Sequence, residues 1–226
     1  MIRSAKNPGS LKNPKNNMRA IREPVNFFTH AIPALLVIPA SFVLLEMADT
    51  STETTAAWVY GICSLLLFSI SAIYHGYPNT EQSVRFWQKF DHCCIYLMIA
   101  GSYTPVSLLV FDGWIRWALF GVVWFIAIAG CLLKIFNRLK HKGISLTIYI
   151  TMGALIVPLM NNMVEKLPFA AVGWMLLGGF FYVGGTFFYY KDRAISRYVH
   201  THEIWHLFVI AGAISHYVFN YQYLFK

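Results

Sequence analysis

The sequence has 226 residues, of which 57% are hydrophobic, 17% aromatic and only 12% charged, and its mean hydropathy is +0.51. Soluble globular domains carry about 25% charged residues, so this composition excludes an ordinary soluble fold and indicates one polytopic membrane bundle. The formal charge of +8 does not indicate nucleic acid as a partner, because the basic residues lie in loops on one side of the predicted membrane. We therefore expect membrane lipids as partners and no nucleic acid, and the sequence identifies no protein partner.

The chain begins with a polar, basic segment, residues 1–22, that is interrupted by Pro8 and Pro14. This segment lacks the early apolar core of a signal peptide, so we expect it to be a flexible cytoplasmic tail. Residues 23–226 are then expected to form a single membrane domain.

Seven apolar runs of bilayer length follow the tail, and they predict an all-α bundle of seven transmembrane helices. Four prolines lie inside the predicted spans, Pro158 among them. We expect them to produce kinks that neighbouring helices accommodate. Paired glycines at 178–179 and 184–185 are expected to allow close packing of the sixth span. The predicted spans are Phe27–Met47, Ala56–Tyr77, Phe90–Phe111, Trp117–Phe136, Ile144–Met163, Phe169–Tyr190 and His202–Leu224.

The distribution of charge orients the predicted bundle. If the N-terminus is cytoplasmic, all of the 18 basic residues except Arg116, Lys166 and Lys226 fall in the inner segments. Basic loops remain on the cytoplasmic side of membrane proteins, so we expect a cytoplasmic N-terminus and a C-terminus outside.

Three histidines lie at the edges of the predicted spans. His202 and His206 are four residues apart, so both imidazoles project from one face of a helix. His75 ends the second apolar run, and the predicted orientation places it at the same cytoplasmic depth. Imidazole is a preferred zinc ligand, and three protein ligands leave one coordination position for water. This convergence favours a hydrated metal site between the second and seventh spans over three unrelated interfacial histidines.

Two oxygen-bearing side chains are predicted to lie at the same membrane depth as the three histidines. Asp91 lies at the cytoplasmic start of the third span, where a carboxylate could orient a water molecule or accept its proton. Ser71 precedes His75 by four residues, so its hydroxyl shares a helix face with that imidazole. We therefore regard Asp91 and Ser71 as candidate catalytic residues.

Motifs spread in order along nearly the whole chain resemble the progestin and adipoQ receptor (PAQR) family, with a closer match to its bacterial hemolysin III branch. The resemblance implies a seven-helix protein of a bacterial inner or plasma membrane, with a zinc site near the cytoplasmic face. The segments that carry it are Ser71–His75, Lys89–His92, His202–His206 through His216, Ala100–Pro105, and the spaced residues Glu23, Asn26 and His30.

The resemblance also assigns roles to individual residues. The zinc ligands map onto His75, His202 and His206. Asp91 matches an acidic residue near the water on zinc, and Ser71 matches the serine that precedes the first ligand.

Two functions are compatible with this resemblance. The first is zinc-dependent hydrolysis of a lipid amide, with Asp91 as the general base or as the group that positions water. The second is non-enzymatic: a structural zinc joins the second and seventh spans, and the bundle regulates or senses membrane fluidity and energy state. A third interpretation, a ligand receptor, lacks an evident extracellular recognition domain.

Other polar residues of the motifs are assigned structural roles. His216 follows His206 by ten residues, about 15 Å along an ideal helix, which is too deep to share the metal. We expect His216 to form an internal hydrogen bond and His92 to be a structural residue at the interface. The entry of the first span is expected to be stabilised by His30, Glu23 and Asn26, with a role near the site left open.

Overall fold

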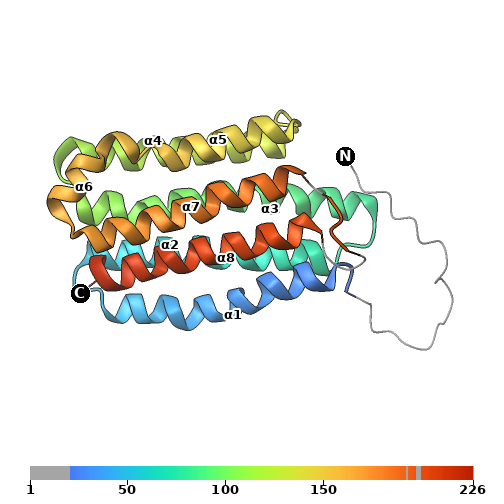
Figure 1. The fold of residues 1–226 in the computed structure, drawn as a ribbon, viewed down its shortest axis with the longest axis horizontal. Helices are drawn as coiled ribbons and strands as arrows, with labels where there is room; N and C mark the ends of the chain where they lie inside the picture. The colour runs from blue at the N-terminus through green and yellow to red at the C-terminus, as the bar shows by residue number, and fades with distance from the viewer. Residues whose placement is uncertain (1–20, 192, 197–199, 226) are drawn as a thin grey trace.

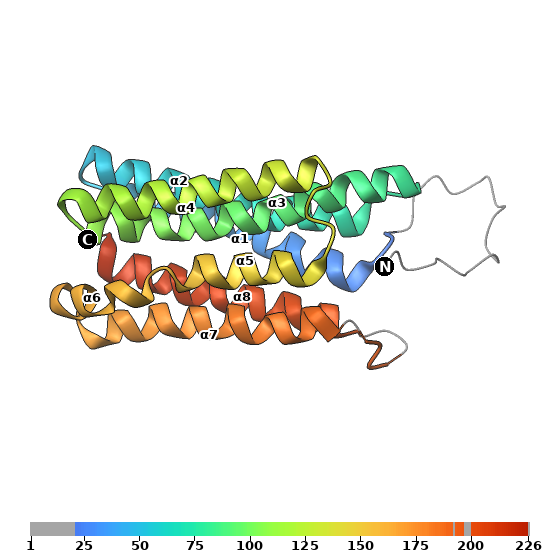
Figure 2. The same cartoon turned by 90° about the horizontal axis from the view of Figure 1, so that it is seen from above.

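The computed structural model of the chain describes residues 21–191, 193–196 and 200–225, so the predicted tail lies almost wholly outside the described residues. Long helices run side by side along one axis of the molecule (Figures 1 and 2). Two π-helical turns, Val106–Val110 and Asn220–Leu224, extend α3 and α8. The helices are α1 (Pro24–Glu46), α2 (Ser51–Gly76), α3 (Glu81–Pro105), α4 (Gly113–Ile135), α5 (Lys142–Ala154), α6 (Met160–Lys166), α7 (Phe169–Lys191) and α8 (Thr201–Phe219).

Six helical segments within the described residues are long and apolar enough to cross a membrane. They are α1, α2, α3 with its π turn, α4, the segment Lys142–Lys166, and α7. This result confirms the predicted all-α membrane fold. The 19-residue helix α8 packs against α1 and α7 but is not among the six candidates. The seventh crossing and the orientation of the bundle therefore stay predictions.

The outer face of α1 shows that the bundle is built for apolar surroundings. Only 17% of its most apolar stretch is buried. Its inward side chains include the polar Asn26 and His30, whereas Leu35 and Leu36 are 70% and 62% exposed. A helix that turns polar groups inward and large apolar groups outward is stable where the surrounding medium is lipid.

The fifth predicted span, Ile144–Met163, is not one continuous helix. Helix α5 ends at Ala154, and a 3-10 turn at Val157–Leu159 leads into α6. Proline at position 158 has no backbone N–H to donate, and its ring clashes with the carbonyl four residues earlier. The expected kink is therefore a break in the helix.

Helix α3 begins well before Phe90, the predicted start of the third span. Thr80 and Ser83 form a capping box, and Arg85 pairs with Glu81 one turn earlier at 2.8 Å. These local interactions make the segment before Phe90 helical, so α3 starts nine residues before the predicted span. Asp91 consequently lies inside α3 and not at its start, which corrects the prediction.

Gly185 allows α7 to approach α8 closely, as predicted for the glycines of the sixth span. A Cβ atom at Gly185 would lie 2.7 Å from the ring of Trp205, whereas one at Gly179 would meet nothing within 4 Å. We expect Gly185→Ala to lower the free energy of unfolding by about 1–3 kcal/mol through overpacking. Gly179→Ala, in the same helix, should be neutral or slightly stabilising. Circular dichroism melts in detergent test this, and equal melting temperatures for the two variants would contradict it.

One end of the bundle gathers the starts of α1, α3, α5 and α8 and the ends of α2, α4 and α7 (Figure 1). The opposite end carries Arg116 and Lys166 together with acidic residues of the α1–α2 region. The predicted separation of charge is therefore present in the fold. The described basic residues at the first end are Arg22, Arg85, Lys89, Lys134, Arg138, Lys140, Lys142, Lys191 and Arg193.

Candidate metal centre

The chain segment before α1 lies against the last turn of α2. The backbone N–H groups of Arg22 and Glu23 donate to the carbonyls of Gly76 and His75 at 3.1 and 3.0 Å. These bonds satisfy carbonyls that a helix end leaves open. Pro24 then begins α1, where its missing N–H costs nothing. This local arrangement places the Glu23 carboxylate beside the imidazole of His75.

The first turns of α8 supply His202 and His206 from one face. The Glu203 carboxylate between them accepts a hydrogen bond from the backbone N–H of His200 at 2.6 Å and completes a capping box. In zinc proteases with His-Glu-x-x-His spacing, the glutamate is the general base. Here Glu203 caps the helix and is not among the residues that line the adjacent cavity. The spacing of His202 and His206 therefore supports a role as metal ligands, but it does not make Glu203 a general base.

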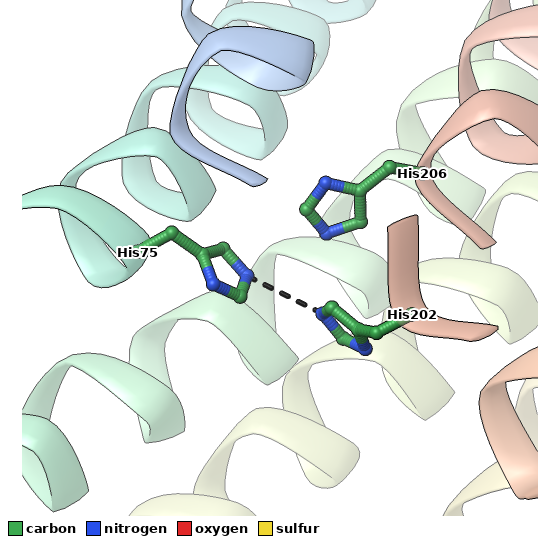
Figure 3. A group of neighbouring side chains, drawn as sticks. All are labelled: His75, His202 and His206. Atoms are coloured by element: carbon green, nitrogen blue, oxygen red, sulfur yellow. Dashed lines mark hydrogen bonds between the residues drawn. The ribbon is translucent and has the colours of Figure 1, made fainter. Parts of the chain in front are cut away.

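The three predicted ligands form a compact cluster between α2 and α8 (Figure 3). One ring nitrogen of each histidine lies within 4.8 Å of those of the other two. His75 and His206 are only 2% and 1% exposed, and His202 is half-buried. The Nε2 atoms of His75 and His202 face each other at 3.4 Å. The cluster could therefore hold a metal ion.

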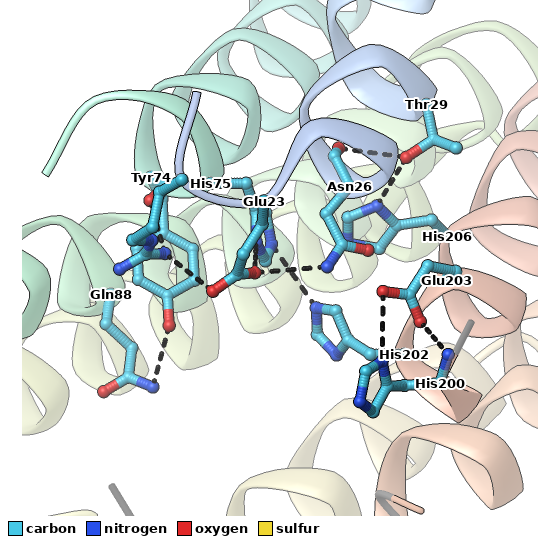
Figure 4. A network of polar contacts seen from close by, with 11 residues as sticks. Glu23, Asn26, Thr29, Tyr74, His75, Gln88, His200, His202, Glu203 and His206 are labelled. Carbon is cyan, nitrogen blue, oxygen red and sulfur yellow. Dashed lines mark hydrogen bonds and ion pairs between the residues drawn. The ribbon is translucent and has the colours of Figure 1, made fainter. Parts of the chain in front are cut away.

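The separation of one pair of donor atoms is compatible with a shared ion. Two nitrogens bound to one zinc at about 2.0–2.1 Å lie about 3.3–3.4 Å apart, which matches the separation between His75 and His202. Outer partners occupy the Nδ1 atoms of two rings: Glu23 Oε2 lies 2.6 Å from His75, and Thr29 Oγ1 lies 2.9 Å from His206 (Figure 4). Occupied Nδ1 atoms leave Nε2 free to ligate.

Glu23 orients His75, a role that the sequence analysis did not assign. Partial burial raises the pKa of Glu23, but the hydrogen bond and charge of His75, with the charge of Arg22, lower it to about 2. The carboxylate is therefore ionised at neutral pH and accepts the Nδ1–H of His75. In the neutral form of His75, this bond to Nδ1 leaves the lone pair on Nε2, which faces His202.

Thr29 orients His206 in a similar way. Its hydroxyl donates to the backbone carbonyl of Asn26 at 2.9 Å, so its oxygen can accept the Nδ1–H of His206. The Asn26 amide in turn donates to Glu23 at 3.1 Å. The N-cap and the first two turns of α1 thus support ligands from both α2 and α8.

We expect Glu23→Gln to weaken metal affinity by about 10–100-fold, because outer-sphere partners fix the tautomer and basicity of a ligating imidazole. Competition of the purified variant with a chromophoric zinc chelator measures this affinity. Glu53→Gln is the matched control, since Glu53 caps α2 at the other end of the bundle. Equal affinities of the two variants would show that Glu23 does not support the site.

Asp91 and Ser71 lie next to the cluster, on α3 and α2. Ser71 is within hydrogen-bonding range of the Asp91 carboxyl, which is also close enough to His75 for direct electrostatic interaction. Both residues line a cavity together with His202 and His206. The two candidate catalytic residues and two of the three candidate ligands therefore line the same cavity, whereas His75 is not among its lining residues.

This cavity has a volume of about 570 Å³ and extends from the histidine cluster into the bundle as far as Asn220. Its wall is mainly apolar. Phe180 and Val157, which also line it, are 66% and 60% exposed. The cavity wall thus includes side chains that reach the outer surface of the bundle, from α7 and from the 3-10 turn after α5. A mainly apolar cavity with a few polar groups suits an acyl chain.

The other histidines of the motifs take different positions. His30 stacks on His206 with ring centroids 3.7 Å apart and lines the cavity, so it belongs to the surroundings of the site. His216 places its Nε2 atom 3.2 Å from a backbone carbonyl of α7, the internal hydrogen bond that was predicted. His92 lies 3.2 Å from the hydroxyl of Tyr189 and also lines the cavity.

The fold and the cluster define an integral membrane protein with a buried three-histidine site. The chain belongs to the Haemolysin-III related family, whose sequence pattern matches residues 18–217. It is 36% identical to Hemolysin-3 of Bacillus cereus over 197 residues, which cover 84% of this chain and 86% of that protein. It is 31% identical to the Hemolysin-3 homolog of Bacillus subtilis (strain 168) over 202 residues, 88% of this chain and 92% of that one.

A relative in Homo sapiens matches this chain over a similar length. The monocyte to macrophage differentiation factor is 31% identical over 208 residues, which cover 89% of this chain and 84% of that protein. The family resemblance inferred from the sequence motifs is confirmed.

Proposed function

We propose that this protein is a zinc-dependent membrane hydrolase that cleaves lipid amides. The observation that carries the proposal is the position of the histidine cluster, with Asp91 beside it, at the head of a large apolar cavity. Three imidazoles suit zinc and leave a position for a reacting group. The cavity supplies space for an acyl chain.

Each residue of the site has a separate role in the proposed hydrolysis. Zinc, held by the three histidines, would polarise the amide carbonyl and acidify a water molecule. Asp91 takes the proton from the attacking water and passes it to the leaving nitrogen. Ser71 holds the Asp91 carboxyl in place by its hydroxyl. Water oxygen joins the acyl carbon as the C–N bond breaks, so the products are a carboxylic acid and an amine.

The cavity contributes by positioning. An acyl chain that enters between α5 and α7 would place its carbonyl near Asp91 and lose its freedom to move away, which lowers the entropic part of the barrier. The substrate would come from the membrane, so membrane lipids are the proposed partners.

A second candidate function rests on the helices that the cluster joins. His75 ends α2 and His202 begins α8, so a shared ion would link segments far apart in the sequence. Metal binding of this kind contributes folding free energy. In this function the zinc is structural, and the bundle regulates or senses membrane fluidity and energy state without turnover.

We also propose that the site lies near the cytoplasmic face of a bacterial inner or plasma membrane. The basic residues at the same end of the bundle support this orientation.

A panel of N-acyl lipids, assayed with purified zinc-loaded protein, separates the two functions. Under the hydrolase function we expect release of fatty acid that stops on chelation and returns with added zinc. If fully zinc-loaded protein turns over none of the lipid amides, the hydrolase function is contradicted and the structural role of zinc is favoured.

A further inference from the structure

Two thiol groups meet between the neighbouring helices α3 and α4. The thiol of Cys93 donates a hydrogen bond to the backbone carbonyl of Cys131 at 3.7 Å, and the thiol of Cys131 donates to the carbonyl of Cys93 at 3.6 Å. The two thiols also interact directly with each other. Both sulfur atoms therefore lie in one gap between the helices, within reach of one another.

The two helices pack closely at this level of the bundle. Gly130 precedes Cys131, and a Cβ atom at Gly130 would lie 2.6 Å from the ring of Tyr96. Tyr96 follows Cys93 by three residues, so the two residues share a face of α3. Because the cysteine side chain is short, reciprocal contacts from sulfur to carbonyl require two backbones that approach closely, as a disulfide also does.

The other two cysteines of the chain, Cys63 and Cys94, are buried in the apolar core. Buried free cysteines usually act as small hydrophobic residues. Cys131 differs from them because it is half-buried and lies four residues, or about 6 Å, before the end of α4. At that end, the Lys89 ammonium donates to the carbonyl of Ile135 at 3.3 Å. One thiol of the pair is thus accessible to a small polar oxidant near the basic end of the bundle.

We propose that Cys93 and Cys131 form a redox-responsive pair, which peroxide converts into a reversible disulfide between α3 and α4. Peroxide reacts first with the half-buried Cys131, whose sulfur gains one oxygen atom to become a sulfenic acid while one water leaves. The Cys93 sulfur then attacks that sulfur, and the sulfenic oxygen leaves as a second water with the Cys93 proton. Two thiols and one peroxide thus give one disulfide and two waters, and a dithiol reductant restores the thiols.

The inference stands apart from the proposed hydrolysis, because neither cysteine of the pair lines the cavity. In the proposed orientation of the bundle, the pair lies toward the cytoplasm. Disulfides in that compartment are usually transient and serve catalysis or redox sensing. The pair would therefore respond to oxidant and return to two thiols when the oxidant is gone.

Peroxide treatment of the purified full chain in detergent tests the proposal. We expect the number of thiols that react with N-ethylmaleimide in the denatured chain to fall from four to two and to recover after dithiothreitol. Mass spectrometry of the digest should show the peptides of Cys93 and Cys131 joined. Cys93→Ser and Cys131→Ser should each abolish this link. Cys63→Ser and Cys94→Ser are the matched controls and should form the link as wild type does.

Four reactive thiols after peroxide treatment would overturn the proposal, and so would oxidation to sulfinic acid without a link. A link between two chains, or one that involves Cys63 or Cys94, would also overturn it. The position of the link is determined in the wild-type protein, so the test stays decisive if a serine variant fails to fold.

Discussion

His202→Ala is expected to lower zinc affinity by at least about a hundredfold, more than the loss typical of an outer-sphere change. The variant removes one of three imidazoles and leaves His75 and His206 on separate helices, without the Nε2 atom that faces His75 at 3.4 Å. Two histidines cannot complete the donor set that zinc uses in proteins. Zinc titration with a competing chelator, together with metal content per chain, measures the effect.

The same variant should lose stabilisation by zinc. A ligand that binds only the folded state stabilises it by about 4.1 kcal/mol at a thousand times its dissociation constant. Wild-type protein should therefore melt at a higher temperature when zinc is added, and His202→Ala should not. His141→Ala, an exposed histidine before α5, is the matched control and should behave as wild type. Full zinc occupancy in His202→Ala would remove His202 from the ligand set.

Asp91→Asn is expected to lower the rate of amide hydrolysis by about a hundredfold to ten-thousandfold, the usual contribution of a general base. Asparagine keeps the size of the side chain but cannot accept the proton of the attacking water. Zinc content should change little, because Asp91 is not one of the three clustered ligands. The rate of fatty-acid release, divided by the zinc content of each preparation, measures this effect.

Asp112→Asn provides the comparison for that experiment. Asp112 pairs with Arg116 at 3.0 Å and Lys166 at 2.6 Å at the opposite end of the bundle, so the same chemical change there should leave hydrolysis unaltered. A zinc-loaded Asp91→Asn protein with the wild-type rate would assign Asp91 a structural role.

Much of the architecture could be predicted because long apolar runs of sequence indicate membrane helices. The i,i+4 spacing of His202 and His206 and the charge of the loops were sufficient to place His75 beside them. The break at Pro158 was only partly predictable. Proline allows either a bend or a break, and the packing of neighbouring helices decides between them.

The surroundings of the site could not be predicted in the same way. Glu23 and His75 are separated by 52 residues, and Thr29 and His206 by 177, so each contact depends on how the helices pack. The early start of α3 depends on a short-range capping box that the search for apolar runs overlooked. The cavity has no local sequence signal, because residues of α1, α2, α3, α5, α7 and α8 all contribute to its wall.

X-ray absorption spectroscopy at the zinc edge of the purified protein tests the central claim most directly, since it reports the atoms around the metal. We expect three imidazole nitrogens and one further oxygen or nitrogen at about 2.0–2.1 Å. Protein that takes up no zinc, or a spectrum dominated by sulfur at about 2.3 Å, would contradict a site formed by His75, His202 and His206.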